Sequence, residues 1–380
     1  MRRLTIVEPY DHHEVVSYLL QVLPDAWQAQ LLCSESVANR LRTSRMLHRA
    51  DVEILGRGPV HLELRKHLEL LENADLLLAS TLQLDPRPAR VLTDLDIPRV
   101  LVVHDANYAF DESARLSRGI LDRLRRSRWR ARGWWRRPGV TVADWHGLVV
   151  GRDSMPRGSA LDRGLEVVPT LATPFACAPV QPLGADPIPP SRALRIALTG
   201  GLDRRRRDYQ PVWAALKRLR RPFEISSGQS LGAGGKAILR QLTVLSAYRP
   251  AHQMAREPDV GDGYEDMLAW ADVLVHPIRA ITSFATVLER YGASKVSGSE
   301  NDQIRSGTFG IYPADYPVRD ELKAMSASYT SGEHLADLLE CFTPVPGSPT
   351  ECLSSAYQTT RWGIFLDRVI RNHRVTKHSQ

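Results

Sequence analysis

Short apolar runs alternate with helical stretches along the first half of the chain, and this alternation limits the possible folds more than any other feature. The stretch His13–Val22 has the apolar spacing of a helix. The apolar runs that predict strands are Leu4–Val7, Ala29–Cys33, Ala74–Ala79, Arg99–Val103 and Gly147–Val150. Runs this short and this apolar are typical of parallel strands that are buried on both faces. We therefore expect a doubly wound, Rossmann-like α/β domain.

A proline-rich break interrupts this pattern. Residues 178–191 read APVQPLGADPIPPS and contain five prolines. Neither a helix nor a central strand tolerates that density of proline. We interpret 178–193 as a linker between two domains, and a length of 380 residues also favours two domains over one.

The α/β pattern starts again after the break. Strands are predicted at 194–199, 222–225, 241–246, 272–277 and 310–313, and helices at 213–219, 264–271, 292–306 and 355–371. The predicted domains are 1–177 and 194–354, and the last helix, in 355–380, is expected to cross back to the first domain. Ligands of such sheets bind at the C-terminal ends of the strands, so the two domains should face each other across a cleft.

Composition narrows the class of protein further. No run approaches the ~18 consecutive apolar residues that a membrane span needs. The chain starts with Met1-Arg2-Arg3 and runs straight into a strand-like segment, which is too short for a signal-peptide core. None of the four cysteines forms a CxxC pair, so neither a zinc site nor a redox motif is indicated. We expect a cytoplasmic protein.

The positive charge of the chain is concentrated in one segment. Residues 115–137 carry ten arginines and one acid, a net charge of +9, which leaves −2 for the rest of a chain whose total is +7. Tryptophans stand among these arginines, and the combination suits an anionic membrane surface. The candidate membrane or acceptor surface is Arg125, Arg126, Arg128, Trp129, Trp134 and Trp135. A solvated basic loop is the main alternative, and nucleic acid is a less favoured partner.

The most informative stretch is 289–313, which reads ERYGASKVSGSENDQIRSGTFGIYP. Gly292 is expected to open a helix, whose N-terminus suits a phosphate, with Lys295 one turn in. Asp302, and less clearly Glu300, are candidates to bind ribose hydroxyls. The candidate donor-binding residues here are Tyr291, Gly292, Lys295, Ser297, Gly298, Glu300 and Asp302. The alternative is a loop and a surface helix with a solvated lysine.

A second candidate phosphate segment is 198–209, LTGGLDRRRRDY. Gly200 and Gly201 follow a predicted strand and permit close backbone approach to a ligand. Four arginines follow, and one or two of them, Arg206 and Arg207 foremost, are expected to bind phosphate oxygens. Taken alone, such a run is more often a solvated face. Two phosphate-binding segments after strands of one domain fit a diphosphate held between them.

These segments resemble the GT-B glycosyltransferases, in particular the group related to the retaining glycosyltransferase family four. The resemblance is carried by LTGGLDRRRRDY, ADVLVHP and YGASKVSGSENDQIRSGTFGIYP, and in the first half by VLVVHDANYAF, HGLVVGRDSM and VVPTLATPF. It covers most of the chain. It implies an acceptor-binding domain at 1–177 and a nucleotide-sugar domain at 194–354. One departure is plain: many members carry two glutamates eight positions apart, but eight positions after Glu289 stands Ser297.

The resemblance also assigns residues. The phosphate-binding basic residues correspond to Arg206 or Arg207 and to Lys295, and the glycine-rich turn to Gly200 and Gly201. The histidine that approaches the donor sugar corresponds to His104. It closes an apolar strand, where an imidazole can hydrogen-bond a hydroxyl or move a proton near neutral pH; capping of the next turn is the alternative.

The loop after the first strand, 8–14, reads EPYDHHE and is dense in acid–base groups. Inverting enzymes of the GT-B fold use a base from the first domain to deprotonate the acceptor hydroxyl. Asp11 and His13 are the candidates for that role, although Asp11 also fits a helix cap. We expect neither a metal nor a cofactor, because arginine, lysine and a helix end can neutralise the leaving diphosphate.

The sequence therefore predicts transfer of a sugar from a nucleotide-diphosphate donor to an acceptor. A growing or lipid-linked glycan at the inner membrane face is the expected acceptor, with the enzyme peripheral to that membrane. Two alternatives stay open: a nucleotide-sugar epimerase of the same fold, and a non-catalytic module that binds polyanions or membranes. A dinucleotide oxidoreductase is disfavoured, because no GxGxxG follows a strand.

Overall fold

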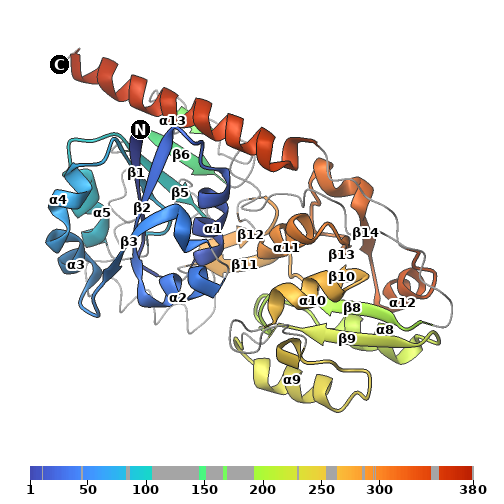
Figure 1. The fold of residues 1–380 in the computed structure, drawn as a ribbon. Helices are drawn as coiled ribbons and strands as arrows, with labels where there is room; N and C mark the ends of the chain where they lie inside the picture. Colours follow the sequence, from blue (N-terminus) through green and yellow to red (C-terminus); the bar gives the residue numbers. More distant parts are fainter. Residues whose placement is uncertain are drawn as a thin grey trace.

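The computed structural model contains two α/β units and a long C-terminal helix (Figure 1). The residues that the structure describes are 1–10, 12–43, 46–82, 86–104, 145–150, 166–168, 192–228, 231–253, 263–284, 287–293, 295, 297–343 and 351–378. Most of the predicted linker, 178–193, and the whole arginine–tryptophan segment lie outside them.

The first unit is built on a seven-stranded sheet in the order β3-β2-β1-β4-β5-β6-β7, with every pair parallel. Its strands are β1 (Arg2–Glu8), β2 (Trp27–Ser34), β3 (Ala50–Leu55), β4 (Leu76–Ala79), β5 (Arg99–Val103), β6 (Gly147–Val150) and β7 (Glu166–Val168). Its helices are α1 (His13–Val22), α2 (Glu35–Thr43), α3 (Val60–Lys66), α4 (Leu68–Glu72) and α5 (Pro86–Thr93). Separate hydrophobic clusters cover the two faces, which explains why the strands are almost wholly apolar.

The second unit is built on a five-stranded parallel sheet in the order β14-β13-β10-β8-β9. Its strands are β8 (Leu194–Leu198), β9 (Phe223–Ser227), β10 (Val273–Val275), β13 (Phe309–Pro313) and β14 (Ser326–Tyr329). Its helices are α8 (Gln210–Arg218), α9 (Gly235–Thr243), α10 (Tyr264–Trp270), α11 (Gly298–Ser306) and α12 (Gly332–Glu340). An antiparallel hairpin, β11 (Ile281–Phe284) and β12 (Val287–Arg290), stands between β10 and α11 in the chain. The prediction of two doubly wound α/β domains is confirmed.

The last helix, α13 (Ser355–His378), lies along the first unit although it follows the second in sequence (Figure 1). Its apolar side, with Trp362 and Phe365 as predicted, belongs to the same core as β1 and α1. The Trp362 indole N–H donates to the Tyr18 hydroxyl at 3.0 Å, and that hydroxyl donates to Gln358 Oε1 at 2.9 Å. The helix therefore ties the end of the chain to the first unit through buried polar contacts.

Most predicted elements match the structure, and two do not. The predicted strand 241–246 is wrong: these residues include the end of α9, because Ile238 and Leu242 stand four residues apart and are both buried. The predicted helix 292–306 begins too early. Gly292 has a φ of +71°, and α11 starts only at Gly298, where the Ser297 side chain accepts a hydrogen bond from Ser299 N.

Candidate functional site

Each sheet has one point where its strand order reverses, and polar residues gather at both points. In the first sheet β2 and β4 flank β1; in the second, β9 and β10 flank β8. At such a switch point a crevice forms outside the C-terminal ends of the two adjacent strands, β1 and β4 in the first sheet and β8 and β10 in the second. Doubly wound proteins bind ligands in this crevice. A ligand site is therefore expected among the residues that follow β1 and β4 and among those that follow β8 and β10.

At the first switch point, Glu8 joins the ends of β1 and β4. Its carboxylate accepts hydrogen bonds from the Ser80 hydroxyl and, at 2.9 Å, from Tyr10 N. The side chain is fully buried, and this burial raises the pKa of Glu8 even though the hydrogen bonds act in the opposite direction. A buried carboxylate thus lies directly under the loop that precedes α1.

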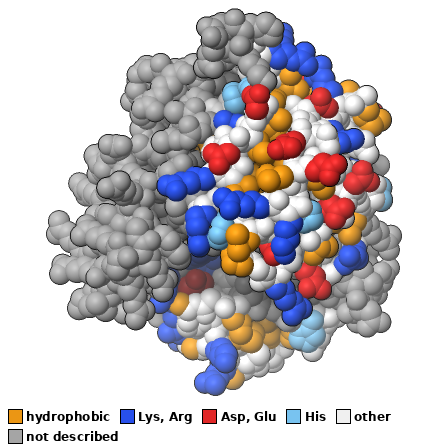
Figure 2. Space-filling view, turned by 90° about the vertical axis from the view of Figure 1, so that its left-hand side faces the viewer, with side chains coloured by type: hydrophobic (Ala, Val, Ile, Leu, Met, Phe, Trp, Pro, Cys, Tyr) orange, Lys and Arg blue, Asp and Glu red, His pale blue; other side chains and the backbone are white. Residues whose placement is uncertain are grey.

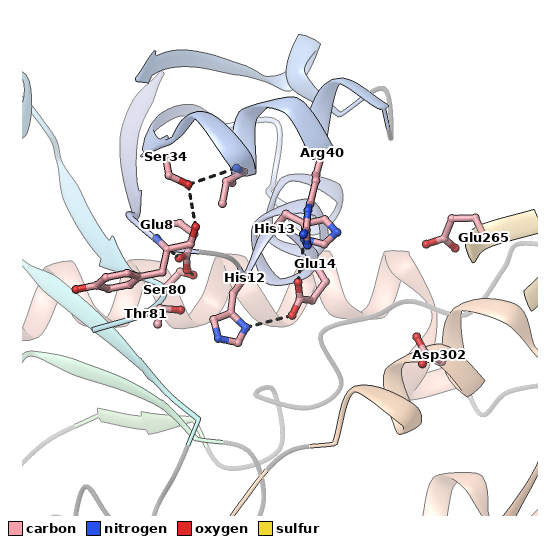
Figure 3. A network of polar contacts seen from close by, with 12 residues as sticks. Glu8, His12, His13, Glu14, Ser34, Arg40, Ser80, Thr81, Glu265 and Asp302 are labelled. Atoms are coloured by element: carbon pink, nitrogen blue, oxygen red, sulfur yellow. Dashed lines mark hydrogen bonds and ion pairs between the residues drawn. The ribbon is translucent and has the colours of Figure 1, made fainter. Parts of the chain in front are cut away.

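His12 and Glu14 form a pair near this carboxylate (Figure 3). His12 Nδ1 lies 3.1 Å from Glu14 Oε1. Burial of Glu14 opposes its ionisation, but the hydrogen bond and charges of the histidines outweigh it and lower the pKa of Glu14 to about 2. Burial likewise favours neutral His12, yet Glu14 outweighs it and raises the pKa of His12. Glu14 is therefore a carboxylate that orients the His12 ring and stabilises its protonated form.

His104 lies against His12, at the end of β5. The two rings are stacked, with centroids 4.5 Å apart and planes 18° apart. His104 Nε2 lies 2.9 Å from the Ser80 carbonyl oxygen, which only accepts, so Nε2 carries the proton. The structure thus brings the predicted His104 into this cluster.

The other two predicted catalytic residues are placed differently. The His13 ring stands beside α2, with Nδ1 3.3 Å from the Arg40 guanidinium and 3.2 Å from Glu14 Oε2. Asp11 lies outside the described residues. Sequence reasoning missed His12 and Glu14, although it recognised the density of acid–base groups in this loop.

At the second switch point, Thr199 joins the ends of β8 and β10. Its hydroxyl donates to Ser299 Oγ at 3.1 Å and lies 2.5 Å from His276 Nδ1. Because the hydroxyl proton points to Ser299, His276 Nδ1 is the donor of the second bond. Burial, and then the charge of Arg207, lower the pKa of His276 to about 3, so this imidazole stays neutral. The first turn of α11 is thereby held directly beside the end of β8.

The turn after β8 is shaped by Gly200 and Arg207. Gly200 has a φ of +71°, its N–H donates to the Tyr264 hydroxyl at 2.8 Å, and a Cβ at this position would overlap the Arg207 guanidinium. Arg207 Nε donates to the Thr199 carbonyl at 3.1 Å. Arg206, by contrast, is exposed, with Nε 3.9 Å from Asp203 Oδ2. Of the predicted pair, Arg207 is the one that lies against the switch point.

Helix α11 is polar in sequence yet mostly buried. Glu300 and Asp302 are 2% and 6% exposed. Both carboxylate oxygens of Asp302 are engaged inside the domain, one by the Tyr264 hydroxyl at 2.7 Å and the other by Arg305 at 2.7 Å. Glu300 stands in the first turn of the helix.

Lys295 is a residue of the second unit whose charge acts on the first cluster. This lysine precedes α11, and its ammonium lies 5.9 Å from the centre of the Tyr291 ring. Burial and the charge of Lys295 both lower the pKa of His12. Glu14 and Glu8 act in the opposite direction and prevail. Figure 3 shows Asp302 to the right of the His12–Glu14 pair.

Among the residues that the structure describes, no three His, Cys, Asp or Glu side chains gather as a metal site, and no helix is long and apolar enough to cross a membrane. Figure 2 shows the side of the first unit that carries α3 to α5. Acidic and basic side chains are interspersed over the coloured part of that face.

No protein-family model and no curated protein sequence matches the chain. Solved structures do. Anabaena HepE in complex with UDP and glucose has a TM-score of 0.53 at 11% identity, over 100% of this chain and 99% of that one. HepE in complex with UDP-glucose has a TM-score of 0.51 at 12% identity, over 100% of both chains.

The apo form of WaaB, a lipopolysaccharide outer core galactosyltransferase, has a TM-score of 0.50 at 9% identity, over 97% of this chain and 99% of that one. Likeness at such low identity shows the fold. The chain has the GT-B fold, with two Rossmann-like domains, as the sequence predicts.

Proposed function

We propose that this protein is a glycosyltransferase that uses a nucleotide-diphosphate sugar. The observation that carries the proposal is that Thr199, at the switch point of the second sheet, contacts both Arg207 and the first turn of α11. Lys295 precedes α11 in the chain, and its charge acts on His12 in the histidine–carboxylate cluster of the first sheet. Two cations and a helix N-terminus fit a diphosphate. HepE, which shares the fold, is known with UDP-glucose bound.

The geometry gives the donor residues different roles. Arg207, Lys295 and the start of α11 at Ser297 and Gly298 would hold the diphosphate, and the turn at Gly200 and Gly201 allows it to approach the backbone. Glu300, in the first turn of α11, and Asp302 are the proposed ribose ligands, and both oxygens of Asp302 already accept hydrogen bonds inside the domain. His104 would meet the donor sugar. Arg206 points away from the switch point, and Tyr291 and Gly292 support Lys295 through their turn.

We further propose that transfer needs no metal ion, because these positive groups can neutralise the leaving diphosphate themselves. Wild-type turnover should then be unchanged in excess EDTA. Loss of turnover in EDTA that Mg²⁺ restores would contradict the metal-independent mechanism.

The proposed acceptor is a glycan, lipid-linked or at the cell surface, which the arginine–tryptophan segment would reach at an anionic membrane.

Nucleotide binding tests the donor site directly. A thermal-shift and calorimetric panel of UDP, GDP, ADP, dTDP and CMP should reveal one preferred diphosphate. A charge-assisted hydrogen bond is worth about 1.5–3 kcal/mol, so Arg207→Gln should weaken that affinity about 10- to 150-fold. Arg206→Gln is the matched control and should leave it within about twofold.

The other outcomes separate the alternatives. If no nucleotide binds the wild type, or if both arginine variants bind alike, the donor site is wrong and the non-catalytic module is favoured. If the nucleotide sugar is converted to its epimer without transfer, the protein is an epimerase.

A further inference from the structure

We propose that His12, oriented by Glu14, is the base that deprotonates the acceptor hydroxyl, and that the transfer therefore inverts the configuration of the sugar. This inference rests on the proposed function and adds the stereochemical course and the catalytic residue. It departs from the retention that the sequence resemblance implies. Two features support it: the arrangement of the His12 cluster, and a serine, Ser297, in place of a carboxylate.

Glu14 fixes the tautomer of His12. An ionised carboxylate only accepts hydrogen bonds, so the proton of the His12 ring lies on Nδ1, 3.1 Å from Glu14 Oε1. The lone pair of Nε2 is then the basic one. The His12 side chain is 42% exposed, so an acceptor hydroxyl can reach it. A carboxylate on one ring nitrogen and a substrate proton on the other is the arrangement of a general-base dyad.

The carboxylates around His12 favour its protonated form. Glu14 on α1 and Glu8 on β1 stabilise the imidazolium, while Lys295 of the second domain opposes it. His104 is stacked on the same ring at 4.5 Å and donates from Nε2 to the Ser80 carbonyl. Two stacked imidazolium ions would repel each other, and the Glu14 carboxylate on the His12 ring assigns the transferred proton to His12.

The step is a single displacement. His12 Nε2 accepts the proton of the acceptor hydroxyl while the hydroxyl oxygen forms a bond to the anomeric carbon of the donor. The bond from that carbon to the phosphate oxygen breaks, and its electron pair leaves with the nucleoside diphosphate. Arg207 and Lys295 meet the charge on that diphosphate. One displacement at one carbon inverts its configuration.

The position of the second family glutamate supports this course. Eight residues after Glu289 stands Ser297, and its hydroxyl is occupied in capping α11. A carboxylate at this place is part of the donor-sugar site that the resemblance to retaining enzymes implies. Here the carboxylates that the structure brings to the reacting face, Glu8 and Glu14, come from the first domain and serve a histidine.

The test measures hydrolysis of a nucleotide sugar, with water as the acceptor, by three histidine variants and one glutamate variant. The donor is UDP-glucose, or the sugar of whichever nucleotide the binding panel selects. We expect His12→Gln to lower kcat/KM about 10²- to 10⁴-fold while UDP affinity stays within about twofold. His13→Gln, at the competing candidate, should lose less than tenfold. His67→Gln, between α3 and α4, is the control for removing a histidine elsewhere in the domain.

Glu14→Gln tests the positioning role. Without the carboxylate, the His12 imidazolium loses a stabilising charge, so the acid limb of the kcat/KM profile should move to lower pH as the maximum falls. A purely structural Glu14 would lower the maximum and leave the limb in place. The anomer is read by proton NMR before mutarotation: α-linked UDP-glucose should give β-glucose first.

Three results would overturn the inference: α-glucose as the first product, a larger loss in His13→Gln than in His12→Gln, or an acid limb that Glu14→Gln does not move. Failure of the proposed function is distinct, because the wild type would then neither bind a nucleotide nor release UDP.

Discussion

Replacing Gly200 by alanine should separate backbone strain from loss of the phosphate site. Gly200 has a φ of +71°, which costs a residue with a Cβ roughly 1–2 kcal/mol. Its Cβ would also overlap the Arg207 guanidinium and push it off the Thr199 carbonyl. If Arg207 binds a diphosphate, moving it removes one charge-assisted hydrogen bond, about 1.5–3 kcal/mol.

The same substitution at Gly234 is the matched control. Gly234 has a φ of +72°, and its Cβ would meet only the flexible side chain of Arg204, with Cδ at 2.9 Å. Urea unfolding should show a similar loss of stability, about 1–2 kcal/mol, for both variants. Calorimetry should show UDP affinity about 10- to 100-fold weaker in Gly200→Ala and unchanged in Gly234→Ala.

The comparison can refute the reasoning in two ways. If Gly200→Ala is destabilised like Gly234→Ala but binds the nucleotide as tightly as the wild type, Arg207 is not a phosphate ligand. If neither variant loses stability, the positive φ is not a constraint and the turn can rearrange.

Three further outcomes are expected. Trp362→Ala should cost about 3–5 kcal/mol in urea unfolding, because this buried side chain joins α13 to the first domain; a loss below 1 kcal/mol would contradict that packing. Burial, and then the charges of Arg99 and His373, lower the pKa of His146 to about 4. The unfolded chain therefore binds more protons at this site than the folded chain, and stability should fall as the pH drops from about 6.5 to 4. Melting curves recorded over this pH range should show a smaller fall for His146→Gln. Ser297→Ala and Ser331→Ala each remove a helix cap worth ~1 kcal/mol, but calorimetry should show weaker UDP binding for the first alone.

The fold was predictable because its strands are buried on both faces. Such strands read as apolar runs, and Arg99–Val103 and Gly147–Val150 have the predicted bounds in the structure. The segment 241–246 misled the prediction, because the end of an amphipathic helix and a short strand share the same few apolar residues. Only the full length of α9, with Ile238 four residues before Leu242, distinguishes the two.

The site was predictable in its segments and less so in its residues. The arginine run and the first loop were recognised from composition, but the direction of each side chain depends on backbone geometry. The turn after Asp203 sends Arg206 to the surface and Arg207 to Thr199. Likewise His12 stands just before α1, beside the strand ends, whereas His13 starts the helix and faces α2. Two histidines adjacent in sequence therefore lie in different environments, and the sequence alone does not show which of them lies at the strand ends.

Helix α11, part of the candidate site, is buried although its sequence is polar. GSENDQIRS offers no apolar stripe, so packing rules predict a surface helix, yet Gln303 is fully buried. Its amide donates to the Met325 carbonyl at 2.7 Å, and its carbonyl accepts from the Tyr312 hydroxyl at 2.5 Å. Buried polar groups cost stability unless such partners exist. Natural chains keep this conflict mainly where function requires it, and a polar helix whose first turn is proposed to meet a charged diphosphate would be such a place.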